Sequence, residues 1–156
     1  MSEERLLSFE LNGGAASAWV QPGTTLLEAL RVHVGATEVK HGCGEGVCGT
    51  CTVLLDGELV SSCTVLALQA DSRSVTTVRS LLSADDALHP LQEAFLRHGA
   101  AQCGFCTPAM LLTARRLAES GRAATREEIR RAIAGNLCRC TGYTQIVDAI
   151  EEYLAR

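Results

Sequence analysis

Eight cysteines in a chain of 156 residues constrain this protein more than any other feature of its sequence. Disulfide scaffolds with this cysteine density are usually shorter and carry an export signal, whereas the first residues here contain no apolar signal core. In a reducing cytoplasm, clustered cysteines more often hold metal or perform redox chemistry. Four is the ligand number of one zinc ion or one iron–sulfur cluster, so the number eight indicates two centres. The cysteines form two groups of four: Cys43, Cys48, Cys51 and Cys63, then Cys103, Cys106, Cys138 and Cys140.

The first group has the spacing C-x4-C-x2-C followed by a more distant cysteine, which is typical of plant-type [2Fe–2S] proteins. Glycines alternate with other residues through this loop, at Gly42, Gly44, Gly46 and Gly49. They allow positive φ angles and bring backbone N–H groups close to the sulfur atoms of a negatively charged cluster. The first group therefore predicts a [2Fe–2S] cluster.

Other interpretations of this loop fit less well. The string from Gly44 to Gly49 formally matches a dinucleotide-binding fingerprint, but no strand–loop–helix unit surrounds it. A zinc site would need two short cysteine pairs, and one of them would have to span Cys51 to Cys63. A Rieske centre needs two histidine ligands, and His41 is alone.

The second group pairs C-x2-C with C-x-C, which matches neither common zinc pattern. Cys106 precedes a helix that Thr107-Pro108 is predicted to open, and Cys140 precedes the last predicted helix. Two helix N-termini would then face the same thiolates, and their partial positive charge favours an anionic cluster. Arg139 can add to this charge, although a lone arginine is more often a surface residue.

The first half of the chain predicts strands around one helix. A capping-box pattern at Thr25 and Glu28 opens the helix, and an Asp56-Gly57 turn joins two of the strands. This arrangement is a ferredoxin-like β-grasp domain. The expected strands are 6–11, 15–20 around a Gly13-Gly14 turn, 52–55, 58–61, 63–68 and 74–78, and the expected helix is 26–33.

The second half predicts four helices, over residues 89–97, 108–119, 126–134 and 145–154. Thr125 and Glu128 form another capping box, and Gly121 and Asn136 suit helix ends. The chain is thus expected to be α+β, with a β-grasp domain at residues 1–80 and a four-helix bundle at 81–156. Apolar residues at helical spacing should face the bundle core: Leu111, Leu112, Ala114, Ile146, Val147, Ile150 and Leu154.

Charge and hydropathy exclude several classes of partner. The net charge is −4 without any block of like charges, which argues against nucleic acid or an anionic membrane surface. No apolar run approaches the roughly 20 residues of a membrane-spanning helix. We expect a cytoplasmic protein.

Three strings resemble the iron–sulfur subunit, or iron–sulfur domains, of molybdenum hydroxylases of the xanthine oxidase type. They are GCGEGVCGTCTV at 42–53, QCGFCTP at 102–108 and GNLCRCTGY at 135–143, in the order of that family. One departure is Ala109, where the family usually has glycine after Thr-Pro. Alanine is favourable in a first helical turn, so this change does not threaten ligation.

The resemblance implies two [2Fe–2S] clusters, one in each domain, held by the eight cysteines. It also implies a large partner subunit with a molybdenum–pterin cofactor and a medium subunit with FAD, in a heterotrimer or a dimer of heterotrimers. Electrons would pass from molybdenum through the helical-domain cluster and the ferredoxin-like cluster to FAD. By resemblance, Gln102 and Cys140 contact the pterin, and no catalytic residue lies on this chain. From the residues alone, Gln102 is simply a polar neighbour of the cysteine loop.

Two rival functions remain at this point: a zinc-stabilised interaction module and a free-standing ferredoxin-like carrier. Phe105, Leu137 and Tyr143 could belong to a partner interface, although core packing is an equal interpretation for each. The sequence does not identify a substrate, because the substrate pocket would lie on another chain.

Overall fold

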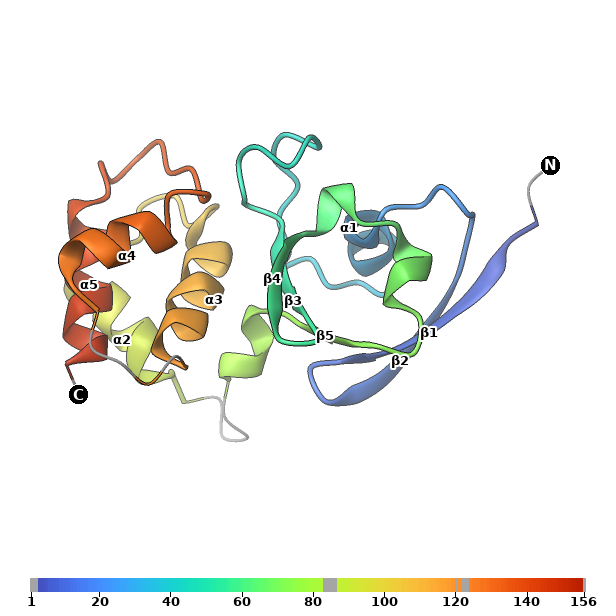
Figure 1. Cartoon of the computed structure of the whole chain (residues 1–156), viewed down its shortest axis with the longest axis horizontal. Coiled ribbons are helices and arrows are strands. Elements are labelled where there is room, and N and C mark those ends of the chain that lie inside the picture. Colours follow the sequence, from blue (N-terminus) through green and yellow to red (C-terminus); the bar gives the residue numbers. More distant parts are fainter. Residues whose placement is uncertain (1–2, 83–86, 120, 122–123, 156) are drawn as a thin grey trace.

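The structure is a computed structural model that describes residues 3–82, 87–119, 121 and 124–155. Strands and one short helix form the N-terminal lobe, and helices form the C-terminal lobe beside it (Figure 1). This arrangement confirms the predicted α+β class. The predicted domain boundary after residue 80 stays a prediction, and residues 83–86 next to it lie outside the described part of the chain.

Two hairpins and a short strand build a five-stranded sheet in the order β2-β1-β5-β3-β4. The strands are β1 (Arg5–Leu11), β2 (Gly14–Val20), β3 (Thr52–Leu55), β4 (Glu58–Ser61) and β5 (Ser74–Thr76). β5 pairs in parallel with β1 and antiparallel with β3, so the end of the first lobe closes its sheet. Both hairpins have two turn residues with positive φ, as the twist of a tight hairpin requires. The first turn is Asn12-Gly13, one residue earlier than predicted.

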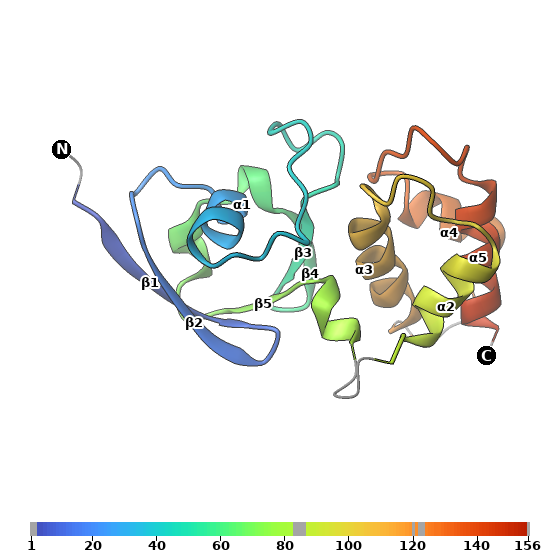
Figure 2. The ribbon, with the colours of Figure 1, turned by 180° about the vertical axis from the view of Figure 1, so that it is seen from behind.

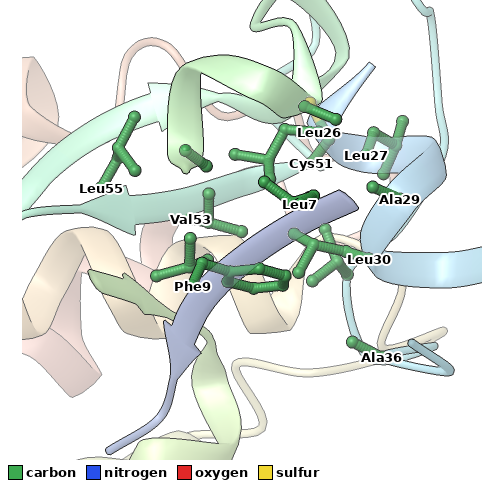
Figure 3. Close-up of a cluster of buried hydrophobic side chains, with 14 of the residues drawn as sticks. Leu7, Phe9, Leu26, Leu27, Ala29, Leu30, Ala36, Cys51, Val53 and Leu55 are labelled. Carbon is green, nitrogen blue, oxygen red and sulfur yellow. The ribbon is translucent and has the colours of Figure 1, made fainter. Parts of the chain in front are cut away.

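The helix against this sheet spans the predicted residues 26–33, but most of it is π-helical. α1 (Leu26–Glu28) runs directly into a π-helical turn, η1 (Ala29–His33), in which Val34 N–H donates to the carbonyl of Ala29 at 3.0 Å. The hydroxyl of Thr25 accepts from Glu28 N–H at 3.1 Å, which confirms the predicted cap. Side chains of this helix meet those of β1 and β3 in a buried core that includes Leu7, Phe9, Leu26, Leu30 and Val53 (Figure 3).

The predicted strand over residues 63–68 is wrong. The chain forms two 3₁₀ turns there, η2 (Ser62–Thr64) and η3 (Ala67–Ala70). Instead of pairing with a strand of the sheet, this segment forms backbone hydrogen bonds with the start of α1 and the residues before it. Leu26 N–H donates to the carbonyl of Val65, and Ala67 N–H donates to the carbonyl of Thr24. The last strand also ends at Thr76, two residues early, since Thr77 caps a further 3₁₀ turn, η4 (Val78–Leu81).

All four predicted helices are present in the C-terminal lobe. They are α2 (Pro90–Arg97), α3 (Thr107–Ala118), α4 (Arg126–Ala132) and α5 (Thr144–Leu154). The capping box of α4 forms as predicted, whereas α3 has Cys106 at its N-cap and Thr107 as its first helical residue. Most residues predicted to face the bundle core do so, and Leu154 is half-buried at its edge. The prediction is wrong for Leu112, which is buried outside this core.

The two lobes meet where α3 packs against β3 (Figure 2). Leu54 on β3 and Leu112 on α3 are buried but belong to neither core, which fits a position in this interface. At the surface of the same interface, Arg116 donates to the carboxylate of Glu58 at 3.1 Å. None of the described helices is long and apolar enough to cross a membrane.

Candidate metal centres

The first cysteine loop, between η1 and β3, gathers backbone N–H groups around one sulfur atom. The N–H groups of Glu45, Val47 and Cys48 all donate to Cys43 Sγ, at 3.4, 3.3 and 3.4 Å. Gly44 and Gly46 have φ angles of 75° and 73°, a conformation that turns successive amides toward a common centre. This concave set of donors fits a negatively charged sulfur ligand.

The other three sulfur atoms of the first group lie around the same loop. Cys48 Sγ accepts from Cys43 N–H at 3.3 Å and lies 3.2 Å from the Thr50 hydroxyl. Cys63 Sγ accepts from Gly46 N–H at 3.3 Å, so the fourth cysteine reaches the loop from η2. Cys51 and Cys63 are buried, whereas Cys43 and Cys48 are half-buried.

These surroundings shift the pKa values of two thiols in the first group in opposite directions. Backbone hydrogen bonds, first that of Glu45 N–H, lower the pKa of Cys43 to about 6. Burial, followed by the neighbouring Cys51, raises the pKa of Cys63 to about 11. A buried thiol of this kind becomes a thiolate only when a cation binds beside it, as an iron ligand would.

The second group lies at the ends of two loops that lead into α3 and α5. Cys103 Sγ and Cys140 Sγ are 3.5 Å apart and exposed. Cys106 is buried at the N-cap of α3, one residue before the predicted cap Thr107. The sequence predicts that Cys140 directly precedes the last helix. It lies four residues before α5, which begins at Thr144, and the N-cap of that helix is Tyr143.

Hydrogen bonds also order the second group. Cys138 Sγ lies 3.2 Å from the Thr141 hydroxyl, and Cys138 N–H donates to the Tyr143 hydroxyl at 2.9 Å. Burial raises the pKa of Cys138, but the bonds from Thr141 and its neighbours outweigh that effect and leave the pKa lowered. Burial, then Cys138, raises the pKa of Cys106 to about 12. The N–H of Phe105 lowers the pKa of Cys103.

The thiols of each group influence one another. Cys103 Sγ lies 3.5 Å from Cys140 Sγ, and side-chain hydrogen bonding links the pKa of Cys43 to Cys48, that of Cys63 to Cys51 and that of Cys106 to Cys138. Across the described ranges, no three His, Cys, Asp or Glu side chains converge on a point where one metal ion would sit. Two sulfur pairs in each group fit the two irons of a [2Fe–2S] cluster, each of which takes two protein ligands.

The remaining candidate residues have distinct positions. Gln102 is exposed beside Cys103. Phe105 and Leu137 are exposed as well, next to the second group, whereas Tyr143 packs against the helical core. Asn136, which suits a helix end by its residue type, is buried between the two cysteine loops, three residues beyond the C-cap of α4.

Comparison with known proteins covers both lobes. Residues 9–83 match the family described as "2Fe-2S iron-sulfur cluster binding domain", and residues 77–151 match "[2Fe-2S] binding domain". The chain is 49% identical to the nicotine 6-hydroxylase small subunit of Paenarthrobacter nicotinovorans, over 92% of this chain and 86% of that protein.

Solved structures give the same result. A chain of quinoline 2-oxidoreductase from Pseudomonas putida superposes with a TM-score of 0.94 at 46% identity, covering 98% of this chain and 94% of that one. The aldehyde oxidoreductase of Desulfovibrio desulfuricans superposes with a TM-score of 0.90 at 42% identity. The aligned region spans 98% of this chain but only 17% of the much longer aldehyde oxidoreductase chain.

Proposed function

Since this chain belongs to the family of [2Fe–2S] small subunits of molybdenum hydroxylases, we propose that its eight cysteines ligate two [2Fe–2S] clusters. As a member of that family, the chain is an iron–sulfur electron-transfer subunit of such a complex. The convergence of the cysteines is the observation that carries this assignment: Cys63 Sγ accepts a hydrogen bond from the first cysteine loop, and Cys103 Sγ lies 3.5 Å from Cys140 Sγ. One cluster would be held by Cys43 with Cys48 and Cys51 with Cys63, in the N-terminal lobe. The other would be held by Cys103 with Cys140 and Cys106 with Cys138.

The donor set fits these clusters. The amides on Cys43 would stabilise the negative charge that a cluster gains on reduction, and the buried Cys51 and Cys63 would keep water from one of its irons. When bound, the clusters supply one-electron redox chemistry. The chain itself ligates them, donates hydrogen bonds to them and limits their contact with solvent.

We further propose a direction for the relay. The second group has two exposed cysteines, Cys103 and Cys140, beside the exposed Gln102 and Phe105. This surface would face the molybdenum–pterin cofactor on a large subunit, with Gln102 and Cys140 nearest the pterin. Electrons would then cross to the first cluster and leave to FAD on a medium subunit, in a heterotrimer or a dimer of heterotrimers.

Neither the substrate nor its binding site belongs to this chain in our proposal. The similar proteins serve enzymes named for nicotine, quinoline and aldehydes, so one kind of relay is compatible with different substrates. We also propose a cytoplasmic location, because clustered cysteines that hold metal fit a reducing compartment.

The test of the assignment is metal and sulfide analysis of the chain purified with its partners. We expect about four irons and four labile sulfides per chain, as two binuclear clusters require, and two distinct EPR signals on reduction. A preparation with zinc and without labile sulfide would support the interaction module instead. A chain that purifies with full cluster content but no molybdenum or FAD subunits would support the free-standing carrier.

Single variants assign each group separately. Cys51→Ser should remove one EPR signal and about half of the iron, and Cys106→Ser should remove the other signal. The assignment of two independent quartets is wrong if either variant abolishes both signals while the protein remains folded.

A further inference from the structure

The two candidate cluster loops touch each other across the interface between the lobes. Leu137, which precedes Cys138, donates its backbone N–H to the carbonyl oxygen of Cys48 at 2.9 Å. Next to it, Gly49 approaches so closely that a Cβ atom on it would lie 2.1 Å from the carbonyl oxygen of Gly135. Gly49 also has a φ of 67°, so both its conformation and its surroundings require glycine.

One side chain joins this contact to the rest of both lobes. Asn136 is only 4% exposed. Its Nδ2 donates to the carbonyl oxygen of Gly49 at 3.0 Å and lies 3.3 Å from the hydroxyl of Thr52, at the start of β3. Its Oδ1 accepts from the hydroxyl of Thr113 on α3 at 2.9 Å. The amide therefore uses its donor in the N-terminal lobe and its acceptor in the C-terminal lobe.

The exposed ion pair between the lobes is a weaker candidate for holding them in register. Arg116 and Glu58 form an exposed ion pair, in which the Glu58 side chain is 75% exposed. Water and salt screen such a pair, and it tolerates changes of distance. A buried amide with short bonds on both sides fixes distance and orientation far more tightly, because separating it from its partners leaves unpaired polar groups in the interface.

We propose that Asn136 is a positioning residue for electron transfer between the clusters: it fixes the spacing of the two cluster loops and thereby sets the coupling of the two clusters. The inference rests on the proposed function, since it needs a cluster at each cysteine group. Asn136 acts through its neighbours in the chain. It binds the carbonyl of Gly49, which follows Cys48 in the first loop, and it lies two residues before Cys138 in the second. Electron tunnelling and magnetic coupling between two centres both weaken steeply with distance, so a small separation of the lobes is measurable.

The experiment uses the complete complex and compares Asn136→Leu with the wild type. Leucine has a similar size but makes none of the three contacts, so the loops should move apart while each group of four cysteines keeps its own geometry. When both clusters are reduced, the magnetic splitting of their EPR signals should be smaller than in the wild type. Electron transfer from the second cluster to the first should also be slower, while the iron content and the g values of each cluster remain unchanged.

Two further variants separate positioning from general stability. Gly49→Ala forces the loops apart from the opposite side and should reduce the splitting as well. Ile129→Val loosens the helical core on α4 and should leave the splitting unchanged. An unchanged splitting in Asn136→Leu, with both clusters present, overturns the proposal.

If Asn136→Leu fails to fold or loses iron, Thr113→Val decides. It removes only the α3 side of the link, by a nearly isosteric change, so a smaller splitting supports the proposal and an unchanged splitting overturns it. A wild-type complex without two clusters would instead contradict the proposed function, so the two failures are distinguishable.

Discussion

Cys43 and Cys63 belong to the same group of thiols but differ strongly in acidity, because three backbone N–H groups surround the first and protein packing surrounds the second. A pKa lowered to about 6 makes Cys43 mostly thiolate at pH 7, and a pKa raised to about 11 keeps Cys63 protonated there. Since the thiolate is the nucleophile, alkylation of the folded, iron-free chain at pH 7 should modify Cys43 well before Cys63.

Mass spectrometry of peptides after timed iodoacetamide treatment measures this order. Denaturing the chain in urea is the control, because it removes both environments and should make the two cysteines react at similar rates. Equal rates in the folded chain would contradict the role given to the backbone amides.

Gly42, like Gly49, has surroundings that leave no room for a side chain. A Cβ atom there would lie 2.6 Å from the Thr50 hydroxyl and 2.7 Å from Cys48 Sγ. Gly42→Ala should therefore displace Cys48, cost about 1–3 kcal/mol through overpacking and lower the occupancy of the first cluster. Iron per chain and the EPR signal of that cluster measure the effect. Gly23→Ala is the matched control, because Gly23 is exposed and an added Cβ meets nothing within 4 Å.

At the scale of elements, local chemistry made most of the fold predictable. Both hairpins, the four C-terminal helices and two N-caps follow from turn residues, capping boxes and apolar periodicity. The errors arise where tertiary contacts decide. The strand expected at residues 63–68 had suitable residues, but its backbone pairs with the segment before α1 and turns to bring Cys63 to the loop.

The capping box of α4 provides a test at this scale. The Thr125 hydroxyl accepts from Glu128 N–H at 3.3 Å, and the Glu128 carboxylate accepts from Thr125 N–H at 2.8 Å. Thr125→Ala should lower the free energy of unfolding by about 1 kcal/mol, as loss of a side-chain cap does. Urea denaturation measures the change. Thr144→Ala, at an exposed position in the first turn of α5, should change it by less than about 0.5 kcal/mol.

At the scale of the whole molecule, the cysteine groups were predictable but the contact between them was not. The spacing of the cysteines is a local signal, whereas Asn136 and Gly49 are 87 residues apart and neither has a pattern that indicates its partner. The residue that joins the lobes therefore appeared in the sequence only as a suitable helix end. Exposure of the individual cysteines is likewise a property of the folded lobes.

The two clusters should differ in their resistance to chelation. Two of the cysteines in the second group, Cys103 and Cys140, are exposed, whereas every cysteine of the first group is at least half-buried. Because solvent access controls the release of iron, a chelator should bleach the second cluster of the isolated small subunit faster than the first. In the complete complex the difference should shrink, since the proposed large subunit covers Cys103 and Cys140. Time-resolved EPR of both signals after addition of a chelator measures the order, and faster loss of the first cluster in the isolated subunit would contradict it.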